Sequence, residues 1–162
     1  MSRVFWDTNL SILMGDAGPN AAAVTHLAER MLERGDILFT SVVSVGELLV
    51  HPVAQGNEAL GHRYENIPSS RTILVPFDQT AARSYARIRQ NKSIKPPDAI
   101  QLACAARTGI DIFITNDDRL RNQALPGIQF IVSLKKRAYL KWIVAEATGP
   151  DFAACASSGP SV

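Results

Sequence analysis

The sequence has few of the residues that build disulfide frameworks, zinc sites or histidine-based catalytic centres. Its 162 residues include two cysteines, Cys104 and Cys155, and three histidines. The cysteines lie far apart and outside any C-x-x-C pattern, which excludes a disulfide framework and a cysteine-rich zinc site. His26, His51 and His62 fall outside every motif described below. Any chemistry at a functional site must therefore come from other side chains.

Long apolar runs and a strong excess of one charge are also lacking. No segment approaches the ~20 apolar residues that a helix needs to cross a bilayer, and the first residues contain no apolar signal core. We therefore expect a cytoplasmic protein without a membrane segment. The net charge of +2 is a mild basic excess, which permits a polyanionic partner without requiring one.

The residues that are present suit a single folded domain. Hydrophobic residues make up 46% of the chain, enough to bury a core and too many for a disordered polypeptide. After Gly149 the sequence turns to small residues, glycine and proline. We predict that residues 1–148 form the domain and that residues 149–162 form a mobile C-terminal tail.

Short apolar runs alternate with segments of helical periodicity along the chain. The runs predict strands at residues 4–6, 37–39, 73–75, 112–114 and 128–132. The periodic segments predict helices at residues 20–34, after a cap at Thr40 or Ser41, and at 57–66, 79–90, 98–109 and 134–147. Pro52 and Gly56 should break the second helix, Pro68 should follow the end of the third, and prolines should keep residues 91–97 in a loop. This alternation predicts an α/β fold of three layers with a mainly parallel central sheet.

Four acidic residues lie just after a predicted strand or in the helix that follows one: Asp7, Glu47, Asp98 and Asp117. The carboxyl ends of parallel strands share one edge of the sheet, so we expect these side chains to meet in one crevice. Crowded carboxylates require cations or bound protons, and oxygen ligands suit Mg²⁺ or Mn²⁺. The pattern therefore predicts a divalent metal site, with Asp118 as a rival for the place of Asp117.

Each acid also has a structural explanation. Asp7 and Asp98 could cap helices, and Asp117 could form an Asx turn. Glu47 lies between Val45 and Leu48 in an apolar helix, where burial without a partner would be costly. Glu47 must therefore face solvent, a basic partner or a metal.

Polar and basic residues near these acids have two interpretations. Side chains that could orient the carboxylates, or simply cap helices and form turns, are Thr8, Asn9, Ser41, Thr115 and Asn116. Basic residues that could hold an RNA backbone, or simply face solvent, form two sets: Arg83, Arg87, Arg89, Lys92 and Lys95, and Lys135, Lys136, Arg137 and Lys141.

Four segments together resemble those of PIN-domain ribonucleases, and among them the VapC-like toxins of bacterial toxin-antitoxin pairs. They are residues 5–9, 40–49, 95–103 and 115–120. The resemblance implies a PIN-like fold and a metal-dependent endoribonuclease that hydrolyses RNA phosphodiester bonds. It implies Asp7 and Asp98 as direct ligands of Mg²⁺ or Mn²⁺, with Glu47 and Asp117 binding directly or through water. It also implies a homodimer and a cognate antitoxin that covers the acidic site and itself binds operator DNA.

Other functions stay open at this point. A PIN-domain nuclease of RNA processing would need no antitoxin, and a PIN-like binding module would not be catalytic. A phosphate-handling α/β domain would usually place a second aspartate two positions after the first. Here Thr8 and Asn9 follow Asp7, which argues against that class.

Overall fold

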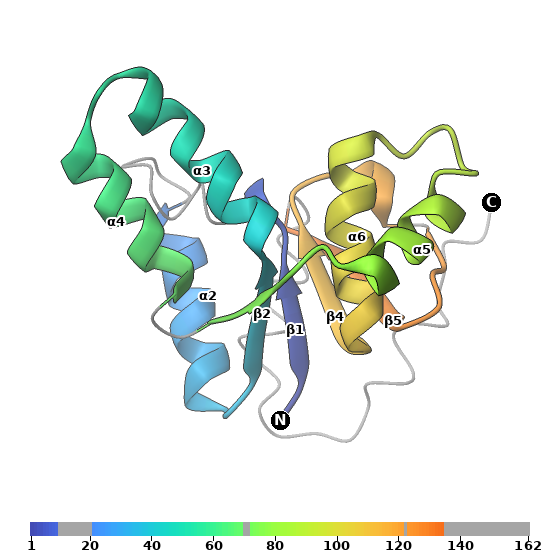
Figure 1. Ribbon diagram of the computed structural model, residues 1–162. Helices are drawn as coiled ribbons and strands as arrows, with labels where there is room; N and C mark the ends of the chain where they lie inside the picture. Colours follow the sequence, from blue (N-terminus) through green and yellow to red (C-terminus); the bar gives the residue numbers. More distant parts are fainter. Residues whose placement is uncertain (10–20, 70–71, 122, 135–162) are drawn as a thin grey trace.

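The computed structural model describes residues 1–9, 21–69, 72–121 and 123–134, and this part contains one five-stranded sheet. The strands are β1 (Arg3–Trp6), β2 (Ile37–Ser41), β3 (Thr72–Val75), β4 (Ile110–Thr115) and β5 (Ile128–Ser133). Their order is β3-β2-β1-β4-β5, and every neighbouring pair is parallel. The helices are α2 (Ala21–Glu33), α3 (Val42–Ala54), α4 (Glu58–Ser69), α5 (Gln79–Ile88) and α6 (Pro96–Thr108), with a 3-10 turn η1 (Asp118–Leu120) (Figure 1). The predicted α/β fold with a parallel sheet is confirmed.

Apolar residues fill consecutive positions of β1, β2 and β4, so these strands are buried on both faces, whereas Ile73 and Leu74 of the edge strand β3 are exposed. On one face, Phe5, Phe39 and Phe113 pack with α5 and α6, and the rings of Phe5 and Phe113 stack with centroids 5.5 Å apart. On the other face, Val4, Leu38 and Ile112 pack against α2. The result is two apolar layers, one on each side of the sheet.

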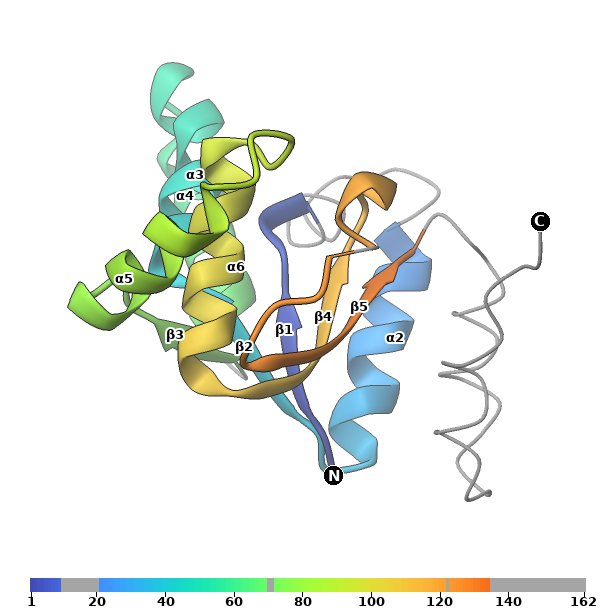
Figure 2. The same cartoon turned by 90° about the vertical axis from the view of Figure 1, so that its right-hand side faces the viewer.

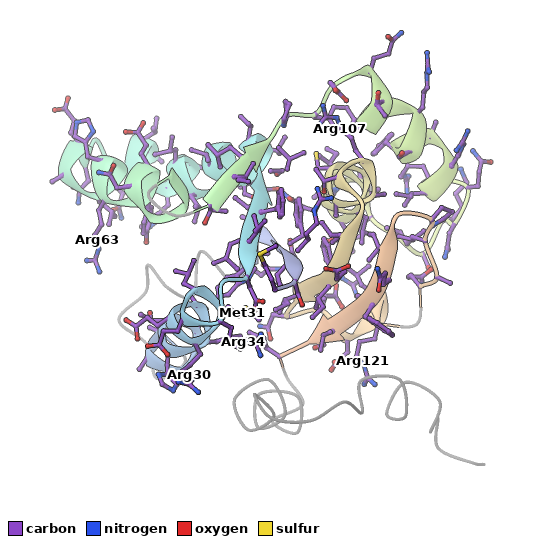
Figure 3. All side chains as sticks on the ribbon, turned by 90° about the horizontal axis from the view of Figure 1, so that it is seen from below. Arg30, Met31, Arg34, Arg63, Arg107 and Arg121 are labelled. Carbon is purple, nitrogen blue, oxygen red and sulfur yellow. The ribbon has the colours of Figure 1, made fainter. Side chains whose placement is uncertain are left out.

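The helices divide unequally between the two faces. In Figure 2, α2 stands on one side of the sheet and the other helices stand on the opposite side. Seen from below, Met31 of α2 points toward the strands and Arg30 points away from them (Figure 3). Met31 is fully buried, whereas Arg30 pairs with Glu33 on the solvent side. This amphipathic pattern is what the periodicity of residues 20–34 predicts.

The order of the strands places a change of direction beside β1. The chain moves from β1 to β2 and β3 on one side, and then crosses to β4 and β5 on the other. Ligand sites of open α/β sheets form at such a point, beyond the carboxyl ends of the strands. Asp7 and Thr115 lie there, at the ends of β1 and β4, and the Asp7 amide donates to the Ile114 carbonyl at 3.0 Å.

Three expectations about prolines are wrong, whereas the predicted break of the second helix at Gly56 agrees with the structure. Helix α3 continues through Pro52, which is buried in it, and ends only at Ala54 before Gly56, whose φ is +60°. Helix α4 includes Pro68, one residue before its end at Ser69. Helix α6 begins at Pro96 and Pro97, because the amides of a first turn have no partner within the helix.

Glycines shape the passage from α6 into the last two strands. Gly109 ends α6 in the left-handed conformation, with φ of +62°. Gly127 has φ of +89°, and a Cβ atom there would lie 2.3 Å from the carbonyl oxygen of Ala106. Only glycine allows that close approach between the end of α6 and the start of β5.

The C-terminal predictions fall beyond the described segments. The helix predicted from residue 134, the tail at 149–162 and the second basic set all lie there, apart from Leu134, which is in a turn. Within the described segments, no helix is long and apolar enough to cross a membrane.

Candidate functional site

A cavity of about 330 Å³ opens at the carboxyl end of the sheet, between the end of β1 and the helices α3 and α6. Its lining residues are Asp7, Thr8, Asn9, Glu47, Val50, Pro97, Asp98 and Gln101. Three of the four predicted acids therefore share one cavity, although they are far apart in sequence. Asp117 is not among the lining residues.

Asp7 is the most deeply buried of these acids, with 3% of its surface exposed. Burial raises the pKa of this carboxyl to about 6, and repulsion from Asp98 adds to the shift. Hydrogen bonds from Thr115 Oγ1 at 2.8 Å and Asn9 Nδ2 at 3.3 Å oppose it. In the described segments no lysine, arginine or histidine pairs with Asp7, so its charge lacks a neighbouring cation. A helical turn starts directly after Asp7, so a capping role is compatible with ligand binding.

Asp98 lies in the first turn of α6, but it does not cap the helix, because Lys95 holds the cap position. Partial burial raises the pKa of Asp98, and the charges of Asp117 and Glu47 raise it further. The nearby cations Arg119 and Lys95 act in the opposite direction. Charge repulsion therefore links Asp98 to each of the other three predicted acids.

Glu47 projects from α3 and is partly buried. Within the described segments, its hydrogen-bond partners are two polar side chains. Thr8 Oγ1 donates a short hydrogen bond to Glu47 Oε2, and Gln101 Nε2 approaches the same oxygen at 3.4 Å. These hydrogen bonds offset the free-energy cost of partly burying a glutamate in an apolar helix.

Asp117 forms the Asx turn that was the structural alternative for it. Its Oδ1 accepts from the Arg119 amide at 3.0 Å, and the Arg119 guanidinium donates to the carboxylate, with Nε at 2.9 Å. The Asp117 amide donates to Thr115 Oγ1 at 3.0 Å. Asp118 is exposed in η1. Of the two candidates for the fourth acid, Asp117 is the one whose charge raises the pKa of Asp98.

The donor set fits a hard divalent cation. Every polar lining group offers oxygen or amide atoms, and neither cysteine nor histidine takes part. Buried Asp7, with its raised pKa, would gain from a neighbouring positive charge. In residues 1–9, 21–69, 72–121 and 123–134, no three His, Cys, Asp or Glu side chains stand close enough to hold an ion as they are placed. Binding would therefore draw the carboxylates closer, and direct ligation by Asp117 would require it to exchange Arg119 for the ion.

Other side chains named from the sequence have separate roles. Thr8 and Thr115 contact carboxylates, as the short polar residues at strand ends were predicted to do. Ser41, rather than Thr40, caps α3, and its hydroxyl donates to Gln101. Asn116 is partly buried at the end of β4.

Gln101 and Ser44 contribute to the site, but sequence reasoning did not select them. Gln101 is 2% exposed and Ser44 is fully buried, and both contact Thr8. A signal was available for Gln101. It is a polar residue in the apolar run of α6, and it follows Asp98 by three positions, so the two share a helix face.

The basic residues before α6 divide into structural and exposed members. Arg89 donates to the Ile94 carbonyl and thereby holds the loop before α6. Lys95 acts on Asp98 through its charge. Arg83, Arg87 and Lys92 are exposed. The exposed members remain candidates for phosphate contacts, and the second basic set lies outside the described residues.

Comparison with known proteins gives a family match and several structural neighbours. A family model for the PIN domain matches residues 4–125. The VapBC2 complex of Rickettsia felis bound to a promoter DNA fragment has a TM-score of 0.65 at 15% identity, covering 80% of this chain and 97% of that one. DNA-bound VapBC of Salmonella typhimurium has a TM-score of 0.62 at 24% identity, covering 82% and 98%.

A third solved structure is Mycobacterium tuberculosis VapC20, a toxin that cleaves the sarcin-ricin loop. It has a TM-score of 0.53 at 15% identity, covering 68% of this chain and 86% of that one. At these identities the solved structures share the fold with this chain. A search of curated proteins gives no significant match.

Proposed function

This chain belongs to the PIN-domain family, and from that premise we propose that it is a metal-dependent endoribonuclease that hydrolyses phosphodiester bonds of RNA. One observation carries the proposal. Asp7, Glu47 and Asp98 line a single cavity at the switch point of the sheet. The deepest of them, Asp7, is buried with a raised pKa, and no basic residue of the described segments pairs with it. Burial disfavours the ionised form of Asp7, and a divalent ion beside it would stabilise that form.

In this proposal the acids bind the metal ion, and neighbouring threonines orient the carboxylates. Asp7 and Asp98 would hold Mg²⁺ or Mn²⁺, and Glu47 and Asp117 would complete the site directly or through water. Bound there, such an ion supplies an activated water and positive charge for the phosphodiester. Thr115 keeps Asp7 oriented through its 2.8 Å hydrogen bond, and Thr8 does the same for Glu47.

Exposed basic residues would guide the RNA backbone to this cavity. Lys95 lies at the cap of α6, one turn before Asp98, and Lys92 is exposed in the preceding loop. Arg83 and Arg87 extend the basic surface along α5. Phosphate contacts of this kind give affinity without sequence preference and weaken as salt rises.

The biological setting we propose is that of a toxin held in check by a cognate antitoxin. Support comes from neighbours that are toxin-antitoxin complexes and an RNA-cleaving toxin. Helix α3 offers Val50 and Val53, which are 68% and 74% exposed, and Val50 also lines the acidic cavity. An antitoxin segment with an apolar face and a basic residue would suit that surface. The toxin would be a homodimer and would meet DNA only through its antitoxin.

The test is cleavage of purified tRNA and ribosomal RNA by the purified protein with Mg²⁺ or Mn²⁺. Cleavage that is lost with EDTA and in Asp7→Asn, but kept in the exposed control Asp118→Asn, is expected. No cleavage under any metal condition would point to a binding module instead. Active enzyme that is harmless when overexpressed would favour RNA processing over the toxin role.

A further inference from the structure

Gln101 joins three elements of the site through one buried side chain. Its Oε1 accepts from Ser41 at 2.8 Å and lies 3.2 Å from Ser44 Oγ, both at the start of α3. Its Nε2 donates to Thr8 Oγ1 at 2.8 Å, beyond the end of β1. The same nitrogen lies 3.4 Å from Glu47 Oε2. Gln101 itself belongs to α6, three residues after Asp98.

The direction of these hydrogen bonds follows from the chemistry of the partners. An ionised carboxylate only accepts, so the amide nitrogen of Gln101 must be the atom that faces Glu47. The carbonyl oxygen then faces the serines, which can donate to it. Ser41 Oγ already accepts from the Ser44 amide at 3.0 Å, which leaves its proton for Gln101.

Thr8 lies at the centre of this network. Ser44 Oγ and Gln101 Nε2 both lie 2.8 Å from Thr8 Oγ1. The amide nitrogen can only donate, so it occupies a lone pair of the hydroxyl, and the hydroxyl proton is directed to Glu47. The orientation of Gln101 thereby fixes which way Thr8 donates.

We propose that Gln101 is a positioning residue that holds the Glu47 carboxylate toward the cavity, directly and through Thr8. It anchors Glu47 on α3 to the helix that carries Asp98, so the two acids keep a fixed relation. The inference rests on the proposed metal-dependent function for its catalytic meaning. The placement of Glu47 by Gln101 is a separate, structural claim.

A double-mutant cycle tests the proposal. Gln101→Met keeps the side-chain length and removes donor and acceptor, while Glu47→Gln removes the charge that is positioned. Gln101→Met should weaken Mn²⁺ binding in calorimetry and lower kcat for RNA cleavage, each by ~10- to 100-fold. In the Glu47→Gln background the same substitution should have little further effect, because it acts through Glu47. Equal losses in both backgrounds would overturn the proposal and assign Gln101 to general packing.

Two further variants separate positioning from loss of the fold. Gln101→Glu keeps an acceptor for Ser41 but puts a carboxylate opposite Glu47, and it should lose at least as much Mn²⁺ affinity as Gln101→Met. Thr8→Val preserves shape, lacks the central hydroxyl, and should weaken binding in the same way. The control Gln129→Met, which breaks an exposed bond to Asp111, should leave Mn²⁺ affinity and kcat unchanged.

Crystal structures of the metal-free wild type and Gln101→Met distinguish failure of this inference from failure of the function. Glu47 should turn away from Thr8, or lose a single conformation, in the variant. An unchanged Glu47 contradicts the positioning role whatever the activity. A displaced Glu47 in a protein whose wild type neither binds Mn²⁺ nor cleaves RNA would support positioning and remove the proposed function.

Discussion

Thr115 Oγ1 donates a 2.8 Å hydrogen bond to Asp7 Oδ2, from the end of β4 to the end of the neighbouring strand β1. Thr115 Oγ1 also accepts a hydrogen bond from the Asp117 amide at 3.0 Å. One hydroxyl therefore holds the most buried acid of the site and fixes the turn that carries another. Thr115 therefore links the position of Asp117 to that of Asp7.

Thr115→Val should weaken the site while preserving the packing. The hydrogen bond from Thr115 lowers the pKa of Asp7, so its loss should raise that pKa further. We expect Mn²⁺ affinity at pH 7 to fall by ~10-fold or more, measured by calorimetry. Thr108→Val, which removes a hydroxyl bond to the Ala105 carbonyl in α6, is the matched control. Equal affinity in Thr115→Val and wild type would contradict the orienting role.

The metal-free protein should lose stability as pH rises through the range from about 4 to about 6. In that range the folded protein binds the Asp7 proton, with a pKa raised from 3.8 to about 6, more tightly than the unfolded chain does. The full shift corresponds to about 3 kcal/mol of lost stability above pH 6. Urea unfolding between pH 4 and 7.5 should show the decline in wild type and a much flatter profile in Asp7→Asn. Identical profiles would show that burial does not raise the pKa of Asp7 in the folded protein.

Asp98→Asn should abolish cleavage and leave the metal-free fold intact or slightly more stable. The pKa of Asp98 is raised by burial and by the charges of Asp117 and Glu47, so removing its charge relieves repulsion. Thermal melts without metal, and again with Mn²⁺, measure both effects. Mn²⁺ should raise the melting temperature of wild type but not of the variant. A strong loss of stability in the metal-free variant would instead indicate a structural role.

Arg119→Gln should tighten Mn²⁺ binding by about two- to fivefold, the range typical of an exposed ion pair. To bind the ion directly, Asp117 must exchange its pairing with the Arg119 guanidinium for the ion, and the variant removes that competition. The gain should be smaller in an Asp117→Asn background, where Arg119 acts only through its charge near Asp98. Weaker Mn²⁺ binding in Arg119→Gln would show that the arginine supports the site rather than competing for Asp117.

Much of the fold follows from local patterns in the sequence. Apolar runs such as residues 37–39 are strands because both faces of the sheet are buried, and Gly109 ends α6 as a left-handed cap. The predictions at the prolines were wrong because the free-energy cost of a proline depends on its position in the helix. Pro96 and Pro97 suit a first helical turn, and Pro52 is tolerated within a helix that packs it away from solvent.

The site was predicted in part. Asp7, Glu47 and Asp98 were expected in one crevice, and all three line the cavity, although only Asp7 directly follows a strand. The pairing of Asp117 with Arg119 depends on the path of η1, and the network of Gln101 depends on how α6 packs against α3. Neither geometry is encoded in spacing along the chain, so both required the three-dimensional structure.

The central claim is that the carboxylates around Asp7 bind a divalent metal ion. Diffraction from crystals soaked in Mn²⁺, collected for anomalous signal, tests it most directly. We expect an anomalous peak in the cavity, within ~2.2 Å of carboxylate oxygens of Asp7 and Asp98, with Asp117 released from Arg119 if it binds the ion directly. We expect no peak in Asp7→Asn. Wild-type crystals with no peak in the cavity, or with Mn²⁺ bound only elsewhere, would contradict the account.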